Sequence, residues 1–253
     1  MSTPTPIALI TGGSRGLGRN AALHVARQGT DVILTYRSRQ AEADAAVAEI
    51  QALGRRAAAL PLDVADSGAF PFFATRVRDV LADWQRDRLD YLVNNAGIGV
   101  HAAFADTTEA QFDELVKIQL KAPFFLTQAL LPLIADGGRI LNVSTGLTRF
   151  SFPGFAAYAM MKGGVEVLTR YLAKELGGRG ISVNTLAPGA IETDFGGGTV
   201  RDDDQANAFV ASVTALGRAG QPDDIGAVVA ALLAPGTGWI NAQRVEASGG
   251  MML

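Results

Sequence analysis

Tyr158 and Lys162 are the residues of this sequence whose types and spacing could move a proton. Apolar residues at Ala157, Met161 and Val165 continue a helical spacing around them, and a helix places positions i and i+4 on the same side. A free phenol has a pKa of about 10 and carries protons poorly at neutral pH. A cation one helical turn away favours the phenolate and lowers that pKa, so this pair could exchange a proton with a substrate oxygen.

The segment TGGSRGLG at 11–18 has a second chemical signature. Gly12, Gly16 and Gly18 follow a short apolar run and open a segment with helical spacing. Glycine permits a tight turn and lets the backbone approach a pyrophosphate at the start of a helix. The pattern predicts a nucleotide cofactor whose phosphates lie at this turn.

The segment TYRSR at 35–39 indicates which nucleotide cofactor. An acid here would accept hydrogen bonds from a ribose 2′-hydroxyl and repel a 2′-phosphate, but the chain has Arg37 followed by Ser38. Arg15 in the glycine turn adds a second guanidinium, and two guanidiniums converging on one place suit a phosphate. The sequence favours NADP(H). NAD(H) is the alternative, in which both arginines are ordinary surface residues.

Seven short apolar runs must position these groups. They begin near residues 7, 31, 57, 90, 138, 181 and 241, and segments with helical spacing separate the first six. This alternation predicts an α/β fold whose parallel sheet is covered by helices on both faces. We expect one domain over residues 1–253, with the chemistry at the carboxyl ends of the strands.

The composition argues against several classes of protein. The 253 residues include no Cys and two His, and the formal net charge is −3. We therefore expect no disulfide or thiol chemistry, no metal site and no nucleic-acid surface. No segment reaches the ~20 apolar residues of a membrane span, and the N-terminal region lacks the basic start of a signal peptide. These features predict no membrane association and a cytoplasmic location.

Five motifs occur in a specific order along the chain: TGGSRGLG, LDV at 62–64, NNAG at 94–97, YAMMK at 158–162 and APGAIET at 187–193. Together they resemble the short-chain dehydrogenase/reductase family, and the likeness continues through RAGQPDDIG and WINAQRVEASGG. The resemblance implies a single-domain Rossmann-type doubly wound parallel sheet of about seven strands. It also implies NAD(P) as cofactor, a carbonyl/alcohol redox reaction and, commonly, a homotetramer.

The resemblance also assigns roles to individual positions. Tyr158 would be the proton donor, and Lys162 would be its electrostatic partner and hold the cofactor ribose. Ser14 and Leu17 would bind the cofactor together with the glycines of the turn. Further cofactor contacts would come from Asp63, Val64, Asn94, Ala96, Gly97, Pro188, Gly189, Ile191 and Thr193. The segment from Phe195 to about Ala215 would be the substrate lid.

The catalytic hydroxyl departs from the family pattern. The family usually has a Ser shortly before the catalytic Tyr, whereas this chain offers both Ser144 and Thr145. Neighbours on a strand point to opposite faces, and alignment of the strand places Thr145 at the catalytic position. A Thr hydroxyl can still donate a hydrogen bond to a developing alkoxide. Ser144 remains the alternative.

A second departure is Gln119, which stands where the family commonly has an Asn that takes part in a proton relay through water. Pro123 follows four residues later. A proline has no N–H for the carbonyl at i−4, and its ring pushes that carbonyl away. We therefore expect the main-chain oxygen of Gln119 to be free to hold a water, with a role for the side chain as the alternative.

These features predict an NADPH-dependent reductase of a small carbonyl substrate, either a 3-oxoacyl thioester or another ketone. The alternatives are an NAD-linked alcohol dehydrogenase and a cofactor-binding regulator with reduced catalysis. Two helices, at about 112–133 and 156–176, predict an oligomer. The first is apolar on most of its circumference and needs cover on more than one side.

Overall fold

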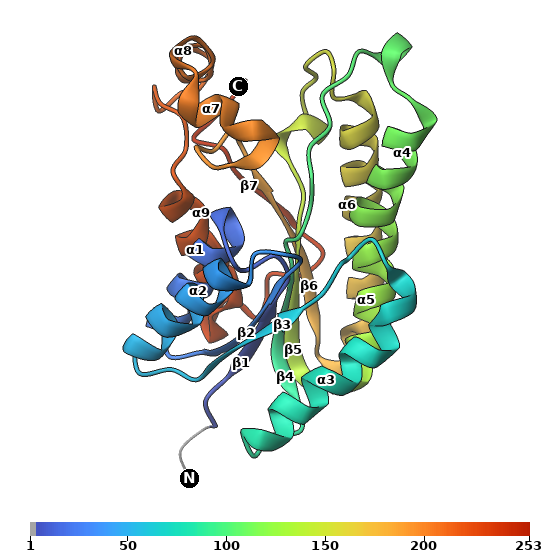
Figure 1. Ribbon diagram of the computed structural model, residues 1–253, viewed down its shortest axis with the longest axis vertical. Helices are drawn as coiled ribbons and strands as arrows, with labels where there is room; N and C mark the ends of the chain where they lie inside the picture. The colour runs from blue at the N-terminus through green and yellow to red at the C-terminus, as the bar shows by residue number, and fades with distance from the viewer. Residues whose placement is uncertain (1–3) are drawn as a thin grey trace.

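The computed structural model describes residues 4–253 and contains one parallel sheet of seven strands (Figure 1). The strands lie in the order β3-β2-β1-β4-β5-β6-β7. Their bounds are β1 Ile7–Ile10, β2 Asp31–Tyr36, β3 Ala57–Pro61, β4 Leu89–Asn94, β5 Ile134–Val143, β6 Ser182–Pro188 and β7 Arg244–Ala247. All seven runs seen in the sequence form strands, so the predicted doubly wound sheet is confirmed.

Helices cover both faces of the sheet (Figure 1). One face carries α1 Gly16–Arg27, α2 Gln40–Ala52 and α9 Pro222–Leu233. The other carries α3 Phe70–Asp83, α4 Glu109–Leu115, α5 Ala122–Leu130 and α6 Ala156–Leu176. Above the carboxyl ends of the strands lie two short helices, α7 Thr199–Asp202 and α8 Asp204–Ser212. Short 3₁₀ turns occur at Ser67–Ala69, Phe104–Asp106, Leu131–Leu133, Gly146–Thr148, Gly177–Arg179, Phe195–Gly198 and Pro235–Thr237.

The alternation of side chains along each strand produces two separate cores. In β1, Ile7 and Leu9 pack in the core beneath α3, α5 and α6, whereas Ala8 and Ile10 pack in the core beneath α1, α2 and α9. All four residues are completely buried. A strand covered on both faces needs apolar residues at every position, which explains why its sequence is an unbroken apolar run.

The strand order reverses next to β1. The chain builds β2 and β3 on one side of β1 and then returns to place β4 on the other. At such a reversal the loops leave the carboxyl ends of β1 and β4 in opposite directions, which opens a crevice for a ligand.

The helix predicted over 112–133 is interrupted. It starts as α4, widens into a π-helical segment over Val116–Lys121, and resumes as α5, in which Pro123 lies in the first turn. The Ala122 N–H bonds to the Lys117 carbonyl, five residues back. Because Pro123 has no N–H, the helix widens locally at this point instead of ending. Within residues 4–253, no helix combines the length and apolarity needed to cross a membrane.

Candidate active site

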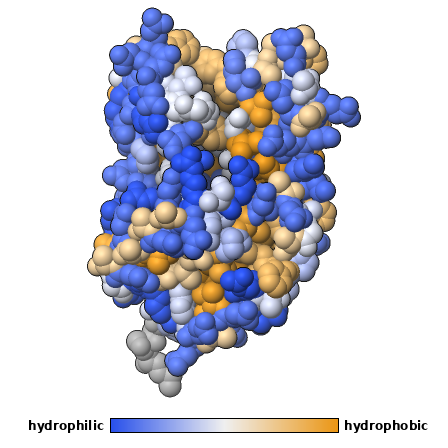
Figure 2. Space-filling model, in the orientation of Figure 1, coloured by the Kyte–Doolittle hydropathy of each residue, from blue (hydrophilic) through white to orange (hydrophobic). Residues whose placement is uncertain are grey.

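A groove of about 680 Å³ runs along the carboxyl ends of the strands. This volume lies within the range of small-molecule and cofactor sites. In the upper part of the face shown in Figure 2, apolar surface lies between hydrophilic flanks. The groove brings together the predicted residues Gly12, Ser14, Arg15, Gly16, Leu17, Gly18, Arg37, Ser38, Asp63, Val64, Ala96, Gly97, Gln119, Thr145, Tyr158, Lys162, Pro188, Gly189, Ile191 and Thr193.

The glycine turn has a backbone that other residues could not adopt without strain. Gly12 and Gly16 have φ values of 65° and 53°. A Cβ on Gly18 would lie 2.2 Å from the Gly12 carbonyl oxygen, so a side chain there would force the turn apart. The turn leads into α1 at Gly16, where free backbone N–H groups and the positive end of the helix dipole suit a phosphate.

The two arginines both line the groove, but the structure does not show them meeting at one point. Arg15 is half exposed, and its Nη1 lies 3.4 Å from Oδ2 of Asp194 on the far side of the groove. Arg37 is exposed at the end of β2 beside Ser38. Both guanidiniums are therefore accessible to an anionic group in the groove.

Asn94 does not line this groove. Its amide lies beneath the groove, where Nδ2 donates to Thr127 Oγ1 at 3.0 Å and to Asn142 Oδ1 at 2.8 Å. The neighbouring Asn95 lines the groove instead, and its Nδ2 donates to the Thr11 carbonyl at 2.8 Å. Asn94 is the last residue of β4, and successive side chains at a strand end point in opposite directions.

Sequence reasoning missed Thr11 as well as Asn95. The Thr11 hydroxyl accepts hydrogen bonds from the main-chain N–H groups of Asn95 and Ala96, both at 2.9 Å. These contacts join the glycine turn after β1 to the segment after β4. The presence of Thr directly before the glycines was a signal, but its partner is more than eighty residues away in the chain.

Tyr158, Lys162 and Thr145 meet at the floor of the groove. Tyr158 and Lys162 are 6% and 5% exposed and come from the first two turns of α6. The Lys162 Nζ lies 5.8 Å from the centre of the Tyr158 ring and donates to the Val143 carbonyl at 2.8 Å. The Thr145 side chain, just beyond β5, lies near enough to the Tyr158 phenol to lower its pKa.

The prediction that Lys162 lowers the pKa of the Tyr158 phenol is wrong. Burial raises the pKa of the Tyr158 phenol, and the nearby Thr145 side chain opposes that rise only in part. Burial also lowers the pKa of Lys162 to about 7. The i, i+4 spacing places the ammonium beside the ring and directs it to a carbonyl, so desolvation dominates both groups.

Ser144 and Thr145 point to different partners. The Ser144 hydroxyl donates to Oε1 of Glu166 at 2.7 Å and is buried. The Thr145 hydroxyl accepts a hydrogen bond from the Leu147 N–H at 3.3 Å and faces Tyr158. Of the two candidate hydroxyls, Thr145 is the one beside the phenol.

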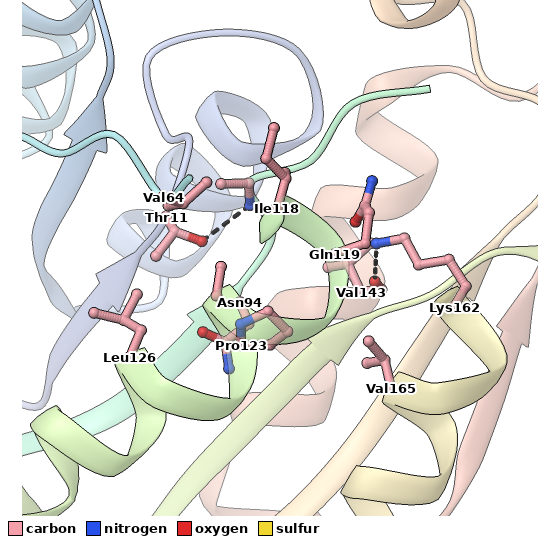
Figure 3. A pocket seen from close by; sticks show the side chains of 12 residues that line it. Thr11, Val64, Asn94, Ile118, Gln119, Pro123, Leu126, Val143, Lys162 and Val165 are labelled. Atoms are coloured by element: carbon pink, nitrogen blue, oxygen red, sulfur yellow. Dashed lines mark hydrogen bonds between the residues drawn. The ribbon is translucent and has the colours of Figure 1, made fainter. Parts of the chain in front are cut away.

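Gln119 and Lys162 line a second, small cavity of about 10 Å³ beneath the groove (Figure 3). This volume holds about one water molecule. Thr11 and Asn94 supply further polar groups to its wall. The Gln119 Nε2 donates to the Ile98 carbonyl at 2.5 Å, whereas its Oε1 is buried and has no hydrogen-bond partner within residues 4–253.

The segment predicted as the substrate lid begins at the groove. Phe195 lines it, and its ring centre lies 6.0 Å from that of Tyr158. A Cβ on Gly99 would lie 2.8 Å from the Phe195 ring. Three consecutive glycines, 196–198, follow with positive φ values and lead into α7.

Comparisons with known proteins agree with this geometry. A family model described as enoyl-(acyl carrier protein) reductase matches residues 12–252. The short-chain dehydrogenase/reductase FrzI of Cladobotryum sp is 34% identical over 250 residues, which cover 97% of this chain and 95% of FrzI.

Two solved structures of ketoreductases superpose closely on this fold. The promiscuous reductase LugOII, which catalyses keto-reduction at C1 during lugdunomycin biosynthesis, is 37% identical, with a TM-score of 0.93 and complete coverage of both chains. The angucycline C-6 ketoreductase LanV, solved with bound NADP, is 32% identical, with a TM-score of 0.93 and coverage of 98% of this chain and 95% of LanV. With the glycine turn and the Tyr158–Lys162 pair in place, the chain belongs to the short-chain dehydrogenase/reductase family and is an NAD(P)-dependent oxidoreductase.

Proposed function

We propose that this protein is an NADPH-dependent reductase that converts a ketone to an alcohol, with Tyr158 as the proton donor. The observation that carries the proposal is the meeting of Thr145, Tyr158 and Lys162 on the floor of a groove that begins at a phosphate-binding glycine turn. The ketoreductase activity of LugOII and LanV supports the direction of reduction.

The groove fits a dinucleotide. The glycine turn lets phosphates approach the backbone, since a Cβ at Gly18 would fill that space. Asp63 and Val64 would hold the adenine, Ala96 and Gly97 the middle of the cofactor, and the residues from Pro188 to Thr193 the nicotinamide end. Bound NADPH supplies the hydride.

Thr145, Tyr158 and Lys162 would stabilise the charge that develops on the substrate oxygen and deliver its proton. The Thr145 hydroxyl would donate a hydrogen bond to the substrate carbonyl oxygen and stabilise the charge that develops there. Tyr158 would transfer its proton to the same oxygen. Hydrogen bonds to the hydroxyls of the cofactor ribose would favour the charged form of Lys162, which would lower the pKa of the phenol. A water in the small cavity would link Lys162 to Gln119 and replace the transferred proton.

Arg15 and Arg37 support NADPH rather than NADH. Both line the groove at the end where the ribose 2′-phosphate would lie, and both guanidiniums are exposed. LanV, with NADP bound, has the same fold. Replacement of Arg37 by Asp would remove an attractive charge and add a repulsive one, so the preference should fall.

The apolar side chains that line the groove near Tyr158 favour a cyclic or aromatic ketone as the substrate. Phe195 faces Tyr158 across the groove, and Ile98 and Gly99 extend the apolar wall. A flat ring can stack on the Phe195 side chain while its carbonyl reaches Tyr158. A 3-oxoacyl thioester offers no ring for this contact.

The test measures NADPH and NADH oxidation against α-tetralone, acetoacetyl thioester and cyclohexanone. We expect turnover with NADPH and the highest kcat/KM for α-tetralone. Arg37→Asp should reduce the NADPH preference by at least tenfold, on the order of 1.4 kcal/mol. Arg27→Asp, at the far end of α1, is the matched control for the change of charge.

Equal kcat/KM for NADH and NADPH in the wild type would instead support an NAD-linked dehydrogenase. Tight NADPH binding without turnover of any ketone would support a cofactor-binding regulator.

A further inference from the structure

We propose that Arg244 and Glu166 are positioning residues that hold Thr145 against Tyr158. This inference rests on the proposed catalytic role of Thr145. Neither residue belongs to the five motifs that carried the resemblance, although Arg244 lies in the C-terminal segment WINAQRVEASGG where the likeness continues. Neither lines the groove. They contact Thr145 and its neighbours from outside the groove.

Arg244 reaches the main chain of Thr145 from the edge strand β7. Its Nη2 donates to the Thr145 carbonyl oxygen at 3.1 Å. Its Nε donates to Glu166 Oε1 at 2.9 Å, and its Nη1 donates to Glu246 Oε2 at 2.7 Å. Its Nε and Nη2 also donate to Thr148 Oγ1 at 3.3 and 3.2 Å, so the guanidinium fork has four partners. A quarter of the side chain is exposed. A planar group held in this way gives the carbonyl a defined position.

Glu166 fixes the residues on either side of Thr145. Its Oε1 accepts hydrogen bonds from the hydroxyls of Ser144 and Thr148, both at 2.7 Å. Glu166 follows Lys162 by four residues and Tyr158 by eight, so these three side chains share one face of α6. Helix α6 therefore supplies both the Tyr158 phenol and the Glu166 carboxylate that binds the residues around Thr145.

The position of Thr145 in the chain explains why it needs this support. β5 ends at Val143, and Ser144 makes the last sheet-like bond, from its N–H to the Leu186 carbonyl at 2.7 Å. Thr145 lies beyond the sheet ladder, where the Leu147 N–H donates to its hydroxyl at 3.3 Å and the Thr148 hydroxyl donates to its carbonyl at 3.0 Å. Arg244 and Glu166 add to these local bonds, because Arg244 binds the same carbonyl and Glu166 binds Thr148. A shift of about 1 Å in a catalytic group can cost about a hundredfold in rate.

A role in stability alone explains these contacts poorly. Burying an ion pair such as Glu166–Arg244 costs desolvation that the attraction between the charges often fails to recover. The side chains of Glu166 and Arg244, 14% and 25% exposed, instead direct most of their hydrogen bonds to one short segment, at Ser144, Thr145 and Thr148. This arrangement is expected of residues that fix the position of the Thr145 hydroxyl.

A double-mutant cycle tests the proposal. The variants are Arg244→Met, Thr145→Val and the two combined, and the measurement is the single-turnover rate of NADPH oxidation with the ketone that the wild type reduces fastest. Arg244→Met alone should lower this rate about 10- to 100-fold without changing the Kd for NADPH. In the Thr145→Val background it should lower the rate less than about threefold, because Arg244 acts through Thr145.

Arg179→Met is the matched control. Arg179 also binds one carboxylate, Asp136, and the carbonyls of Leu131 and Ile134, but at the opposite end of β5. This variant should leave the rate unchanged in both backgrounds. If Arg244→Met does not fold, as judged by circular dichroism, Arg244→Lys takes its place, because a single ammonium keeps the charge but cannot serve all four partners.

Equal losses from Arg244→Met in both backgrounds would overturn the inference and leave the proposed function intact. A Thr145→Val variant with the wild-type rate would overturn the inference and the catalytic role of Thr145, but would leave the reductase activity itself intact.

Discussion

At the residue scale, the two neighbouring hydroxyls have different roles. We predict that Thr145→Val lowers kcat by at least about a hundredfold, the usual cost of losing one donor to a developing oxyanion. Thr145→Ser keeps the hydroxyl and should stay within about tenfold of the wild type. Steady-state kinetics on the purified variants check this order. A larger loss in Ser144→Ala than in Thr145→Val would reverse the assignment.

The buried ammonium of Lys162 leads to a prediction about pH and stability. Its pKa falls from 10.5 to about 7 on folding. Between these values the unfolded chain binds more protons than the folded chain, so stability rises with pH through this window. Below pH 7 the folded state bears the full cost of the buried charge. Lys162→Met should therefore raise the Tm more at pH 6 than at pH 9.5.

Thermal melts of the cofactor-free protein at the two pH values test this prediction. Lys174→Met, an exposed lysine on the same helix, is the control and should show no such difference. A Tm difference between Lys162→Met and the wild type that is the same at both pH values would mean that Lys162 keeps its ordinary pKa in the fold.

At the scale of elements, the π-helical segment before Pro123 places Gln119 at the small cavity. The sequence suggested that the main-chain carbonyl of Gln119 would hold a relay water, but the buried Oε1, which has no hydrogen-bond partner among residues 4–253, favours the side chain. We now predict that Gln119→Leu lowers kcat at least tenfold. Pro123→Ala should cost less, because the Oε1 is retained.

Measurement of kcat for both variants, with circular dichroism to confirm the helix, decides between side chain and main chain. A greater loss in Pro123→Ala would return the role to the carbonyl. Gln119→Glu is a useful companion, since it keeps an oxygen at the same place.

At the scale of the whole molecule, α5 and α6 leave large apolar side chains uncovered. Phe124, Met160 and Tyr171 are 47%, 57% and 65% exposed. We predict that these helices pair with a second copy of the chain, since burial of such side chains contributes about 1.5–3 kcal/mol each. Tyr171→Glu should shift the protein toward the monomer, whereas Phe72→Glu on α3 should not.

Light scattering coupled to gel filtration measures the mass directly. A wild-type particle of 26.4 kDa at micromolar concentration would contradict the prediction of an oligomer.

The sequence by itself determined the order of the elements and most of the groove. Short, unbroken apolar runs with helical segments between them indicate a parallel sheet covered on both faces, and a parallel sheet brings the carboxyl ends of its strands to one edge. Gly12, Gly16, Tyr158 and Lys162 could therefore be placed in one site from local patterns alone.

Only the tertiary structure decided which polar groups meet across long distances in the chain. In the structure, the Asn94 side chain lies in the core and the Asn95 side chain lies in the groove. Ser144 binds Glu166, and Arg244 of the last strand binds the Thr145 carbonyl. Burial raises the pKa of Tyr158 even though Lys162 lies one helical turn away. These outcomes depend on desolvation and on packing between elements far apart in sequence, and no local pattern of residues encodes either.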